Sequence, residues 1–352
     1  MRAFDFASLP SRVVFGRGAA AKVSELAAEL GMQKALVVAT RSQASAAQQL
    51  LDALGARGAA VFAGAAMHTP VEVTEQAMQL VRERSIDGVV AIGGGSAIGL
   101  GKAVALRTDL PQVVLPTTYA GSEMTPILGQ TQDGTKTTQR SAKVLPEAVI
   151  YDVDLTLSLP VGVSVTSGFN AMAHAAEALY GPAANSLVIA AAEECLRNMA
   201  AALPKIVVAP SDAEARAQAQ EAGWLGGWCL ANGGSALHHR LCHVLGGAFD
   251  LPHAETHAIL LPHVLAYNLK AAPEAAERLG EALDTEHPAG ALYDLAQSLG
   301  APSSLKEIGL PRGGIDRVVE EAAAWQGYNP RPVEAKALQQ LLTSAWRGAR
   351  PR

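Results

Sequence analysis

Histidine is the residue type whose distribution in this chain points most clearly to chemistry. Six of the nine histidines lie within the segment from Leu237 to His263, and a seventh, His174, lies in an earlier apolar segment. Neutral imidazole binds metal ions, and imidazole also gains and loses protons near neutral pH. Isolated histidines are more often surface or core residues, but a group that converges in space is expected to form a metal site or a proton-transfer site.

Four of these histidines form two pairs with a spacing of four residues. The pairs are His239 with His243, and His253 with His257. Residues four apart share one face of a helix, so each pair would present two imidazoles on the same side. We expect Gly246 and Gly247 to end the first helix and Pro252 to begin the second. Two helices joined in this way can point their imidazoles into one space, which predicts a functional cleft.

The length and composition of the chain are those of a two-domain globular protein. Its 352 residues, 49% of them hydrophobic, are enough for two domains that each bury a core. The three cysteines, Cys195, Cys229 and Cys242, have no CxxC spacing and indicate a reducing compartment, so we expect a cytoplasmic protein. We expect neither secretion nor membrane insertion, because the sequence shows no apolar leader and no run of about twenty apolar residues. A formal charge of −5 without a basic stripe argues against nucleic-acid binding.

The first part of the chain alternates short β-branched runs with alanine-rich helical patterns. This order is typical of βα units around a parallel sheet. Six strands are predicted: Arg12–Phe15, Ala35–Ala39, Ala59–Phe62, Gly88–Ile92, Gln112–Pro116 and Ala148–Tyr151. The polar stretch 133–140 is expected to be a surface loop, and from Ser164 on the periodic patterns predict helices only. We therefore predict an α/β domain over residues 1–157 and an all-helical domain over residues 158–352, with the site in the cleft between them.

A glycine-rich turn follows the fourth predicted strand. It consists of Gly93, Gly94, Gly95 and Ser96, and a helical pattern comes next. Glycine lets a ligand approach the backbone closely, and the N–H groups and dipole at a helix start favour a pyrophosphate. A structural turn would use such glycines too, so the spacing alone is a weak signal. Its position between a strand and a helix favours a dinucleotide-binding domain.

Two other polar loops follow predicted strands and would complete a dinucleotide site. After the fifth strand, Thr117, Thr118 and Ser122 could hold a ribose or a nicotinamide amide. After the second strand, Thr40 and Arg41 stand where a dinucleotide fold often presents an acid to the adenosine ribose. An acid would repel a 2′-phosphate, and none is present, so we expect both NADH and NADPH to be accepted. An ordinary polar loop explains Thr40 and Arg41 equally well.

Together, these motifs resemble the iron-containing alcohol dehydrogenase superfamily. The resemblance extends over the whole chain, from Phe15–Gly18 to Asn329–Arg331. It implies a dehydroquinate synthase-like fold, with an N-terminal dinucleotide-binding domain and a helical catalytic domain. It also implies a divalent metal held by an aspartate, a histidine four residues later and two further histidines. In this chain those positions are Asn170, His174, His239 and His253.

Position 170 departs from the pattern of the superfamily. Asn170 places an amide where a carboxylate is usual, which removes the anionic ligand that would hold a dication. We therefore expect no metal, and we expect the amide to donate a hydrogen bond where a carboxylate could not. The nearest alternative is a metal-dependent alcohol dehydrogenase with Asn170 as a neutral ligand. A nucleotide-sensing or scaffolding protein without enzymatic activity is a further alternative, although the histidine block argues against it.

Three segments resemble one branch of the superfamily, the maleylacetate reductases. They are HAETHA at His253–Ala258, GGGSAIGLGK at Gly93–Lys102, and NPRPV at Asn329–Val333. The resemblance implies that NADH or NADPH reduces the activated double bond of maleylacetate, a small dicarboxylate, to 3-oxoadipate during the breakdown of aromatic rings. It also suggests a homodimer, in which the strand Arg12–Phe15 could pair across a twofold axis.

The resemblance further implies roles for the histidines. His243 matches the histidine that lies near the nicotinamide in the superfamily, so it is the first candidate for the acid that delivers a proton, and His253 is the second. Reduction of an enone spreads charge into an enolate, which hydrogen-bond donors can stabilise without a metal. His174, His239 and His257, if partly protonated, would attract the two carboxylates of the substrate.

Overall fold

The computed structural model describes residues 4–132 and 135–351. They cluster into two compact units. Among these residues, one unit is Ser8–Leu159, and the other is residues 160–351 together with residues 4–7. Residues 4–7 therefore cluster with the C-terminal unit, which the sequence patterns did not indicate.

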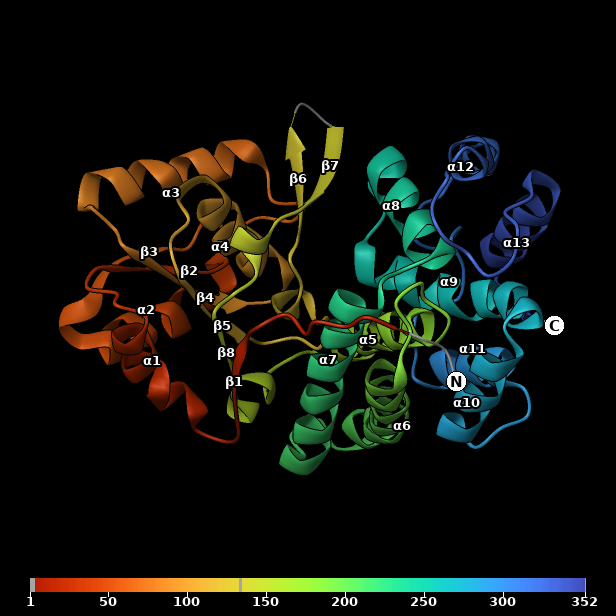
Figure 1. The fold of residues 1–352 in the computed structure, drawn as a ribbon, viewed down its shortest axis with the longest axis horizontal. Helices are drawn as coiled ribbons and strands as arrows, with labels where there is room; N and C mark the ends of the chain where they lie inside the picture. Colours follow the sequence, from red (N-terminus) through yellow and green to blue (C-terminus); the bar gives the residue numbers. More distant parts are fainter. Residues whose placement is uncertain (1–3, 133–134, 352) are drawn as a thin grey trace. The chain divides into compact units, whose positions relative to one another are not determined.

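The unit Ser8–Leu159 is built around a six-stranded parallel sheet (Figure 1). Its strands are β1 (Arg12–Phe15), β2 (Ala35–Val38), β3 (Gly58–Phe62), β4 (Gly88–Gly93), β5 (Gln112–Pro116) and β8 (Ala148–Tyr151), in the order β1-β8-β5-β4-β2-β3. Every neighbouring pair runs parallel. All six predicted strands are present, and β2, β3 and β4 each differ from the prediction by one residue at one end.

Helices cover both faces of this sheet (Figure 1). On one face lie α1 (Val23–Glu29) and α2 (Ala44–Leu54), and on the other lie α3 (Val71–Arg84) and α4 (Gly95–Thr108). Neighbouring residues of β2 belong to different cores, since Leu36 packs in the core with α3 and α4 and Val37 in the core with α1 and α2. A strand buried on both faces needs no alternation of polar and apolar residues, which explains its continuous apolar run. Short 3-10 helices connect these elements: η1 (Ala19–Lys22), η2 (Arg41–Gln43), η3 (Gly55–Arg57), η4 (Ser122–Met124), η5 (Ala142–Val144) and η6 (Val153–Thr156).

The expectation of a loop over residues 133–140 is wrong for most of that stretch. β6 (Ile127–Gln132) and β7 (Thr135–Arg140) form an antiparallel hairpin outside the main sheet. Threonine is a good strand former even in a polar sequence, and the register pairs Gln130 with Thr137 and Gly129 with Thr138. Residues 133 and 134 lie outside the described residues.

Among the described residues of the C-terminal unit, all regular secondary structure is helical, as predicted. Its helices are α5 (Val161–Leu179), α6 (Ser186–Val208), α7 (Ala213–Gly233), α8 (Leu237–Phe249), α9 (His253–Asn268), η7 (Leu269–Ala271), α10 (Pro273–Leu283), α11 (Pro288–Ser298), α12 (Gly314–Ala323) and α13 (Ala335–Arg347). α5 is buried along almost its whole length from Ser164 on, and it packs against α6, α7 and α9. Within residues 4–132 and 135–351, no helix is both long enough and apolar enough to cross a membrane.

The two helices that carry most of the histidines pack against each other. The predicted end of the first is wrong, because α8 continues through Gly246 and Gly247 to Phe249 and ends where Asp250 adopts a left-handed conformation with φ 52°. Glycine inside a helix costs about 1 kcal/mol relative to alanine, and burial of neighbours such as Leu245 overrides that cost. The second helix begins as predicted, with Pro252 as the N-cap of α9.

Candidate active site

Six histidines from three helices of the C-terminal unit form one cluster. His174 lies on α5, His238, His239 and His243 lie on α8, and His253 and His257 lie on α9. The ring centroids are 4.9 Å apart for His174 and His239, 5.0 Å for His239 and His257, 4.8 Å for His238 and His257, 4.4 Å for His253 and His257, and 6.4 Å for His243 and His253. The structure thus brings all five predicted histidines together. His238, which the sequence analysis did not select, joins them.

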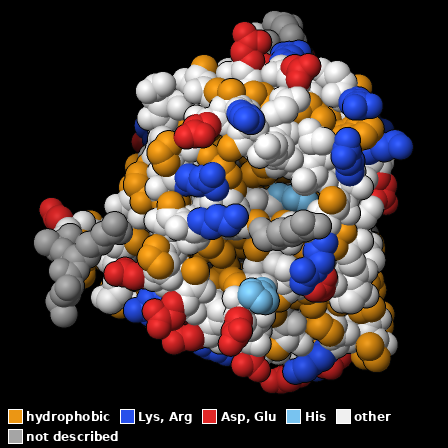
Figure 2. Space-filling view, turned by 90° about the vertical axis from the view of Figure 1, so that its right-hand side faces the viewer, with side chains coloured by type: hydrophobic (Ala, Val, Ile, Leu, Met, Phe, Trp, Pro, Cys, Tyr) orange, Lys and Arg blue, Asp and Glu red, His pale blue; other side chains and the backbone are white. Residues whose placement is uncertain are grey.

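The histidines of this cluster differ in exposure. His174, His238, His239 and His257 are buried, whereas His243 and His253 are partly exposed. The rings of the latter two are nearly parallel, with 16° between their planes. Figure 2 shows one face of the molecule, on which little histidine surface is visible and charged side chains of both signs are interspersed. Within the cluster, His243 and His253 are therefore the two imidazoles best placed to exchange protons with solvent.

Within the part of the chain that the structure describes, several buried polar atoms of the cluster have no hydrogen-bond partner. They are Nδ1 of His174, Nδ1 of His238, Nε2 of His239, both ring nitrogens of His257, and Oδ1 of Asn170. Asn170 lies one turn before His174 on α5, and only 4% of its surface is exposed. A buried polar atom without a partner costs about 1–3 kcal/mol, and such atoms in native proteins usually serve a ligand, an ion or a bound water. Their concentration here favours a binding site for a polar molecule.

Glu177, which the sequence analysis did not select, organises the cluster. It lies on α5 and is fully buried. Its carboxylate accepts hydrogen bonds from the backbone N–H groups of Ala236 at 2.8 Å and His238 at 2.7 Å, at the start of α8. It also accepts a hydrogen bond from Nδ1 of His239 at 2.6 Å. The hydrogen bond to Glu177 uses Nδ1 of His239, so Nε2 is the ring nitrogen left for a ligand of the cluster.

The ionisation of these groups follows from burial and hydrogen bonding. Burial alone would raise the pKa of Glu177, but the hydrogen bond from His239 and the neighbouring imidazoles hold it below its ordinary value. Burial lowers the pKa of His174 and of His257 well below the ordinary value, and the other imidazoles lower it further. Burial also lowers the pKa of His238 to about 4, against the opposing effect of Glu177. Glu177 is therefore ionised at neutral pH, and these three histidines are neutral.

The condition of partial protonation, under which His174 and His257 would attract carboxylates by charge, is therefore not met. A full charge in a space that excludes water is costly unless an opposite charge lies beside it, and the neighbours of these two rings are mostly other imidazoles. As neutral rings, each carries one N–H that can donate a hydrogen bond to an oxygen. Their contribution to binding an anion would therefore be hydrogen bonding rather than net charge.

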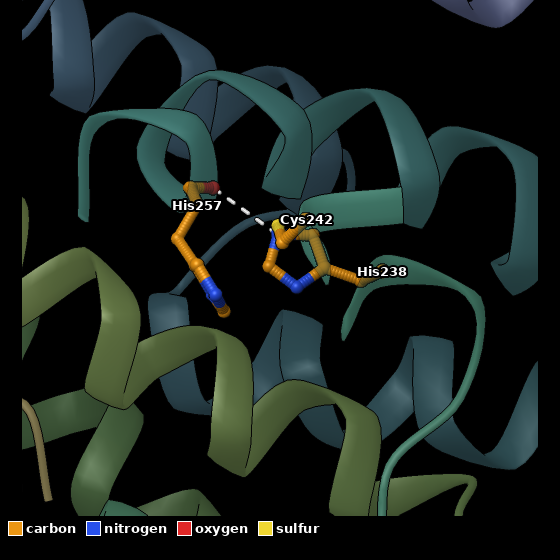
Figure 3. Close-up of side chains that lie close together, drawn as sticks. All are labelled: His238, Cys242 and His257. Carbon is orange, nitrogen blue, oxygen red and sulfur yellow. Dashed lines mark hydrogen bonds between the residues drawn. The ribbon is translucent and has the colours of Figure 1, made fainter. Parts of the chain in front are cut away.

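Position 170 differs from the metal set that the resemblance implies, because it offers a neutral amide in place of a carboxylate. Among the described residues, two groups of side chains have their donor atoms all within 4.8 Å of one another: His238, Cys242 and His257, and Glu177, His238 and His239. Neither includes His174 or His253, and position 170 offers a neutral amide. In the first group, Nε2 of His238 already hydrogen-bonds the backbone carbonyl of His257 at 3.1 Å (Figure 3). In the second, Glu177 is occupied by N–H donors.

The other unit brings together the predicted phosphate and nucleoside loops. Gly93 has φ 143°, and a Cβ there would lie 2.8 Å from the Cβ of Ala97 and 2.9 Å from Oε1 of Gln43. A Cβ at Gly94 would lie 2.8 Å from Cγ2 of Thr118. The backbone N–H of Thr117 donates to the carbonyl of Gly93 at 3.0 Å, and Nε2 of Gln43 donates to Oγ1 of Thr117 at 2.9 Å. The loops after β2, β4 and β5 therefore meet where an open parallel sheet binds ligands.

The remaining predicted cofactor residues occupy less constrained positions. Gly95 is the first residue of α4, and a Cβ there would meet nothing within 4 Å, so packing does not require this glycine. No side chain caps the start of α4, which leaves its first N–H groups available to a phosphate. Thr40 hydrogen-bonds Ser42, and Arg41 begins η2 with an exposed side chain. Gln43 is the residue of this site that the sequence analysis missed.

A cavity of about 810 Å³ lies elsewhere in the C-terminal unit, beside α10 and α11. Its lining includes Leu269, Lys270, Glu277, Glu281 and His287. No histidine of the cluster and no predicted cofactor residue lines it. The candidate chemistry therefore lies outside this cavity.

Comparisons with known proteins agree over the whole chain. Residues 10–153 match the family described as iron-containing alcohol dehydrogenase, and residues 164–346 match the C-terminal part of the Fe-containing alcohol dehydrogenase family. The maleylacetate reductase of Rhizobium sp. (strain MTP-10005) is 51% identical, with 100% of both chains covered. The maleylacetate reductase of Sphingobium indicum is 49% identical over 99% of both chains. The crystal structure of maleylacetate reductase from Agrobacterium tumefaciens is similar with a TM-score of 0.96 at 51% identity, covering 100% of both chains.

Proposed function

The chain belongs to the iron-containing alcohol dehydrogenase family, and from that membership we propose that it reduces maleylacetate to 3-oxoadipate with NADH or NADPH. The resemblance and the fold class predicted from the sequence are confirmed, and the chain is an oxidoreductase. The proposal of this substrate rests above all on 51% identity over the full length to a protein named for this activity. The proposal is tested by measuring the oxidation of NADH or NADPH in the presence of maleylacetate and by identifying the product.

The reaction requires hydride and proton transfer to a conjugated double bond. A bound reduced nicotinamide would supply a hydride, which would form a new C–H bond at the alkene carbon farther from the ketone and leave the cofactor oxidised. The alkene electrons would then shift toward the ketone and give an enolate. A proton added to the carbon next to the ketone restores the carbonyl and completes the reduction. The protein must therefore stabilise a transient enolate and supply one proton.

The cluster offers separate groups for these two tasks. His243 and His253 lie at its partly exposed edge, so either can deliver a proton and recover it from solvent, and we assign the delivery to His243 with His253 as the second candidate. The buried neutral rings of His174 and His257 can donate hydrogen bonds to a carboxylate or to the enolate oxygen. His239 hydrogen-bonds Glu177 through Nδ1, which leaves Nε2 to interact with the substrate.

Asn170 is assigned to binding in the same site. Its Oδ1 is buried and has no partner, so the bound state must offer this oxygen a donor, such as a water or a neighbouring imidazole N–H. Its amide N–H groups can donate to a substrate oxygen, which a carboxylate at this position could not do. A carboxylate would also repel the dicarboxylate substrate when no cation lies beside it.

We further propose that reduction of maleylacetate needs no metal. The family is named for iron, so membership gives this proposal no support. Its support is the neutral amide at position 170, where the metal set implied by the resemblance has a carboxylate. Activity is expected to survive prolonged treatment with EDTA, and elemental analysis is expected to find well below one divalent ion per chain. Dialysis without chelator is the control.

The opposite result would be loss of activity in EDTA that returns on addition of iron or zinc. It would place the protein among the metal-dependent alcohol dehydrogenases, with Asn170 as a neutral ligand. The variant Asn170→Asp provides a second readout, since a carboxylate beside three imidazoles should raise the metal content of the purified protein. The same variant should reduce maleylacetate more slowly than the wild type.

Cofactor choice gives a further prediction. NADH and NADPH are both expected to support turnover, because Thr40 and Arg41 leave no acidic side chain at the end of β2 to repel a 2′-phosphate. The measurement is kcat/KM for each cofactor, and Arg41→Asp should shift the ratio toward NADH. A wild-type preference for NADH above about a thousandfold, roughly 4 kcal/mol of discrimination, would contradict this prediction.

The cellular setting and the assembly are also proposals. We propose a cytoplasmic protein, since its three cysteines have no CxxC spacing and their pattern does not indicate a disulfide framework. We propose a homodimer formed through β1, which lies at one edge of the sheet and is partly exposed. An unpaired edge strand offers N–H and C=O groups to a second copy across a twofold axis. The mass of the protein in solution by light scattering tests this assembly.

A further inference from the structure

Lys102 is a buried cation that the chemistry described so far does not use. It lies on α4, two turns after the glycine-rich turn, and its side chain is fully buried. Its ammonium group donates to the backbone carbonyls of Ser122 at 2.6 Å, Thr125 at 2.7 Å and Ile127 at 2.9 Å, and it lies 3.1 Å from Oγ1 of Thr125. All four acceptors belong to one segment of six residues, from Ser122 to Ile127.

That segment is also held from a second side. Glu123 within it is buried, and its carboxylate accepts a hydrogen bond from the hydroxyl of Tyr151 on β8 at 2.8 Å. Burial raises the pKa of Glu123 to about 7, and burial lowers the pKa of Lys102 to about 7, with each charge partly opposing the shift of the other. Buried side chains of the helix α4 and the strand β8 thus both hydrogen-bond to the segment 122–127.

The segment 122–127 directly continues the loop that follows β5. At its start, this loop is fixed by the bond from Thr117 to the carbonyl of Gly93 and by the bond from Gln43 to Thr117. At its far end, it is fixed by Lys102. Residues 118–121 therefore lie between two fixed points of the loop. The first is the hydrogen bond to the glycine-rich turn, and the second is the buried Lys102 on α4, the helix that begins at this turn.

An ionisable amine so deeply buried is a poor choice for stability alone. Removing an ammonium group from water costs several kcal/mol, and apolar residues of similar volume often stabilise a core as well as or better than buried ions. The three backbone carbonyls and one hydroxyl around the ammonium group instead favour a single loop conformation, because hydrogen bonds are directional. A methyl group at this place would pack against several loop conformations equally well. The arrangement suits a loop whose shape matters to a ligand.

We propose that Lys102 is a positioning residue that holds the loop 117–125 in the conformation that binds the nicotinamide cofactor. The inference rests on the proposed function in one respect, namely that this loop contacts the cofactor. Lys102 itself would not touch the cofactor, because its ammonium group is enclosed by the segment 122–127. Its removal should therefore lower the fraction of molecules whose loop is in the cofactor-binding conformation, and so weaken cofactor binding. The histidine cluster and its affinity for maleylacetate should be unaffected.

The test is the dissociation constant of NADH, measured by fluorescence titration of the full chain without substrate. Lys102→Met keeps the length of the side chain and removes its donors. If the freed loop spends about a tenth of its time in the binding conformation, the dissociation constant rises about tenfold. Lys102→Gln keeps two N–H donors and should give an intermediate value. The KM for maleylacetate at saturating NADH is expected to stay within about twofold of the wild type.

Arg216→Met is the matched control. Arg216 is a fully buried cation of the other unit that donates to the carbonyl of Pro210 and to the hydroxyl of Ser164. Its loss should lower the melting temperature as the loss of Lys102 does, but should leave the dissociation constant of NADH unchanged. Where Lys102→Met does not fold, Thr125→Val decides. It removes the hydroxyl that lies 3.1 Å from the ammonium group and that also donates to the carbonyl of Ser122, and it should raise the dissociation constant by about threefold.

The possible failures are distinguishable. A folded wild type that binds neither NADH nor NADPH would count against the proposed function itself. A wild type that binds NADH, with folded Lys102 and Thr125 variants that bind it equally well, would overturn the role of Lys102 alone. An equal rise of the dissociation constant in Arg216→Met would also overturn it, because the effect would then follow from general destabilisation.

Discussion

His243→Ala is expected to lower kcat for maleylacetate by about 10²–10⁴-fold, the usual contribution of a positioned general acid. His243 lies at the partly exposed edge of the histidine cluster, where its ring stacks beside that of His253. The proposed role is to deliver a proton in the transition state, so the variant should bind NADH and maleylacetate nearly as well as the wild type does. Steady-state kinetics with direct titration of NADH separates the two effects.

His287→Ala serves as the control for this substitution, because His287 is exposed and lies outside the cluster. It should leave kcat unchanged. A His243→Ala enzyme with wild-type kcat and a raised KM for maleylacetate would show that His243 binds the substrate. In that case His253→Ala should instead produce the loss of kcat.

Glu177→Gln is expected to damage both stability and catalysis. The amide can no longer accept from all of the N–H groups of Ala236, His238 and His239, and each donor left unsatisfied in the core costs about 1–3 kcal/mol. A Gln N–H facing His239 would also favour the tautomer with the proton on Nε2, so that this nitrogen would donate into the cluster instead of accepting. Residues that orient an active-site histidine in this way commonly contribute about 10–100-fold to activity.

Asp152→Asn is the matched control for Glu177→Gln. Asp152 is a buried carboxylate of the other unit that accepts hydrogen bonds from the backbone N–H groups of Gly18 and Ala20. Its substitution should lower stability to denaturant by a similar amount while leaving kcat at its wild-type value. A Glu177→Gln enzyme that loses stability but keeps its full kcat would mean that Glu177 only holds α8 in place.

The parallel sheet could be predicted from sequence because local patterns carry its signal. Strands buried on both faces read as short continuous apolar runs, as in β2 and β4, and the alanine-rich helices between them have a clear period. The β6–β7 hairpin has no such apolar pattern, since polar residues such as Gln130 and Thr138 fill its paired positions. The end of α8 was predicted too early, at its glycines, because a single sequence does not show that Leu245 and its neighbours are buried in a core.

The candidate site was predicted in its residue types and missed in its organisation. Histidine is rare enough that clustering in sequence signals clustering in space, and the i,i+4 spacing of His253 and His257 gives their shared face directly. Glu177 carries no such signal, because an acid in an alanine-rich helix is an ordinary helix former and its partners lie about sixty residues away. The neutral state of His174 and His257 also depends on burial by distant segments, which sequence spacing does not reveal.

Anaerobic incubation of the purified protein with maleylacetate and NADH, followed by identification of the product, tests the proposed reaction most directly. One equivalent of NADH should be oxidised for each maleylacetate consumed, with 3-oxoadipate as the product, because hydride adds to the double bond and the ketone is restored by protonation. A folded protein that binds NADH but oxidises neither NADH nor NADPH with maleylacetate would contradict the account. So would a product in which the ketone has become an alcohol and the double bond remains.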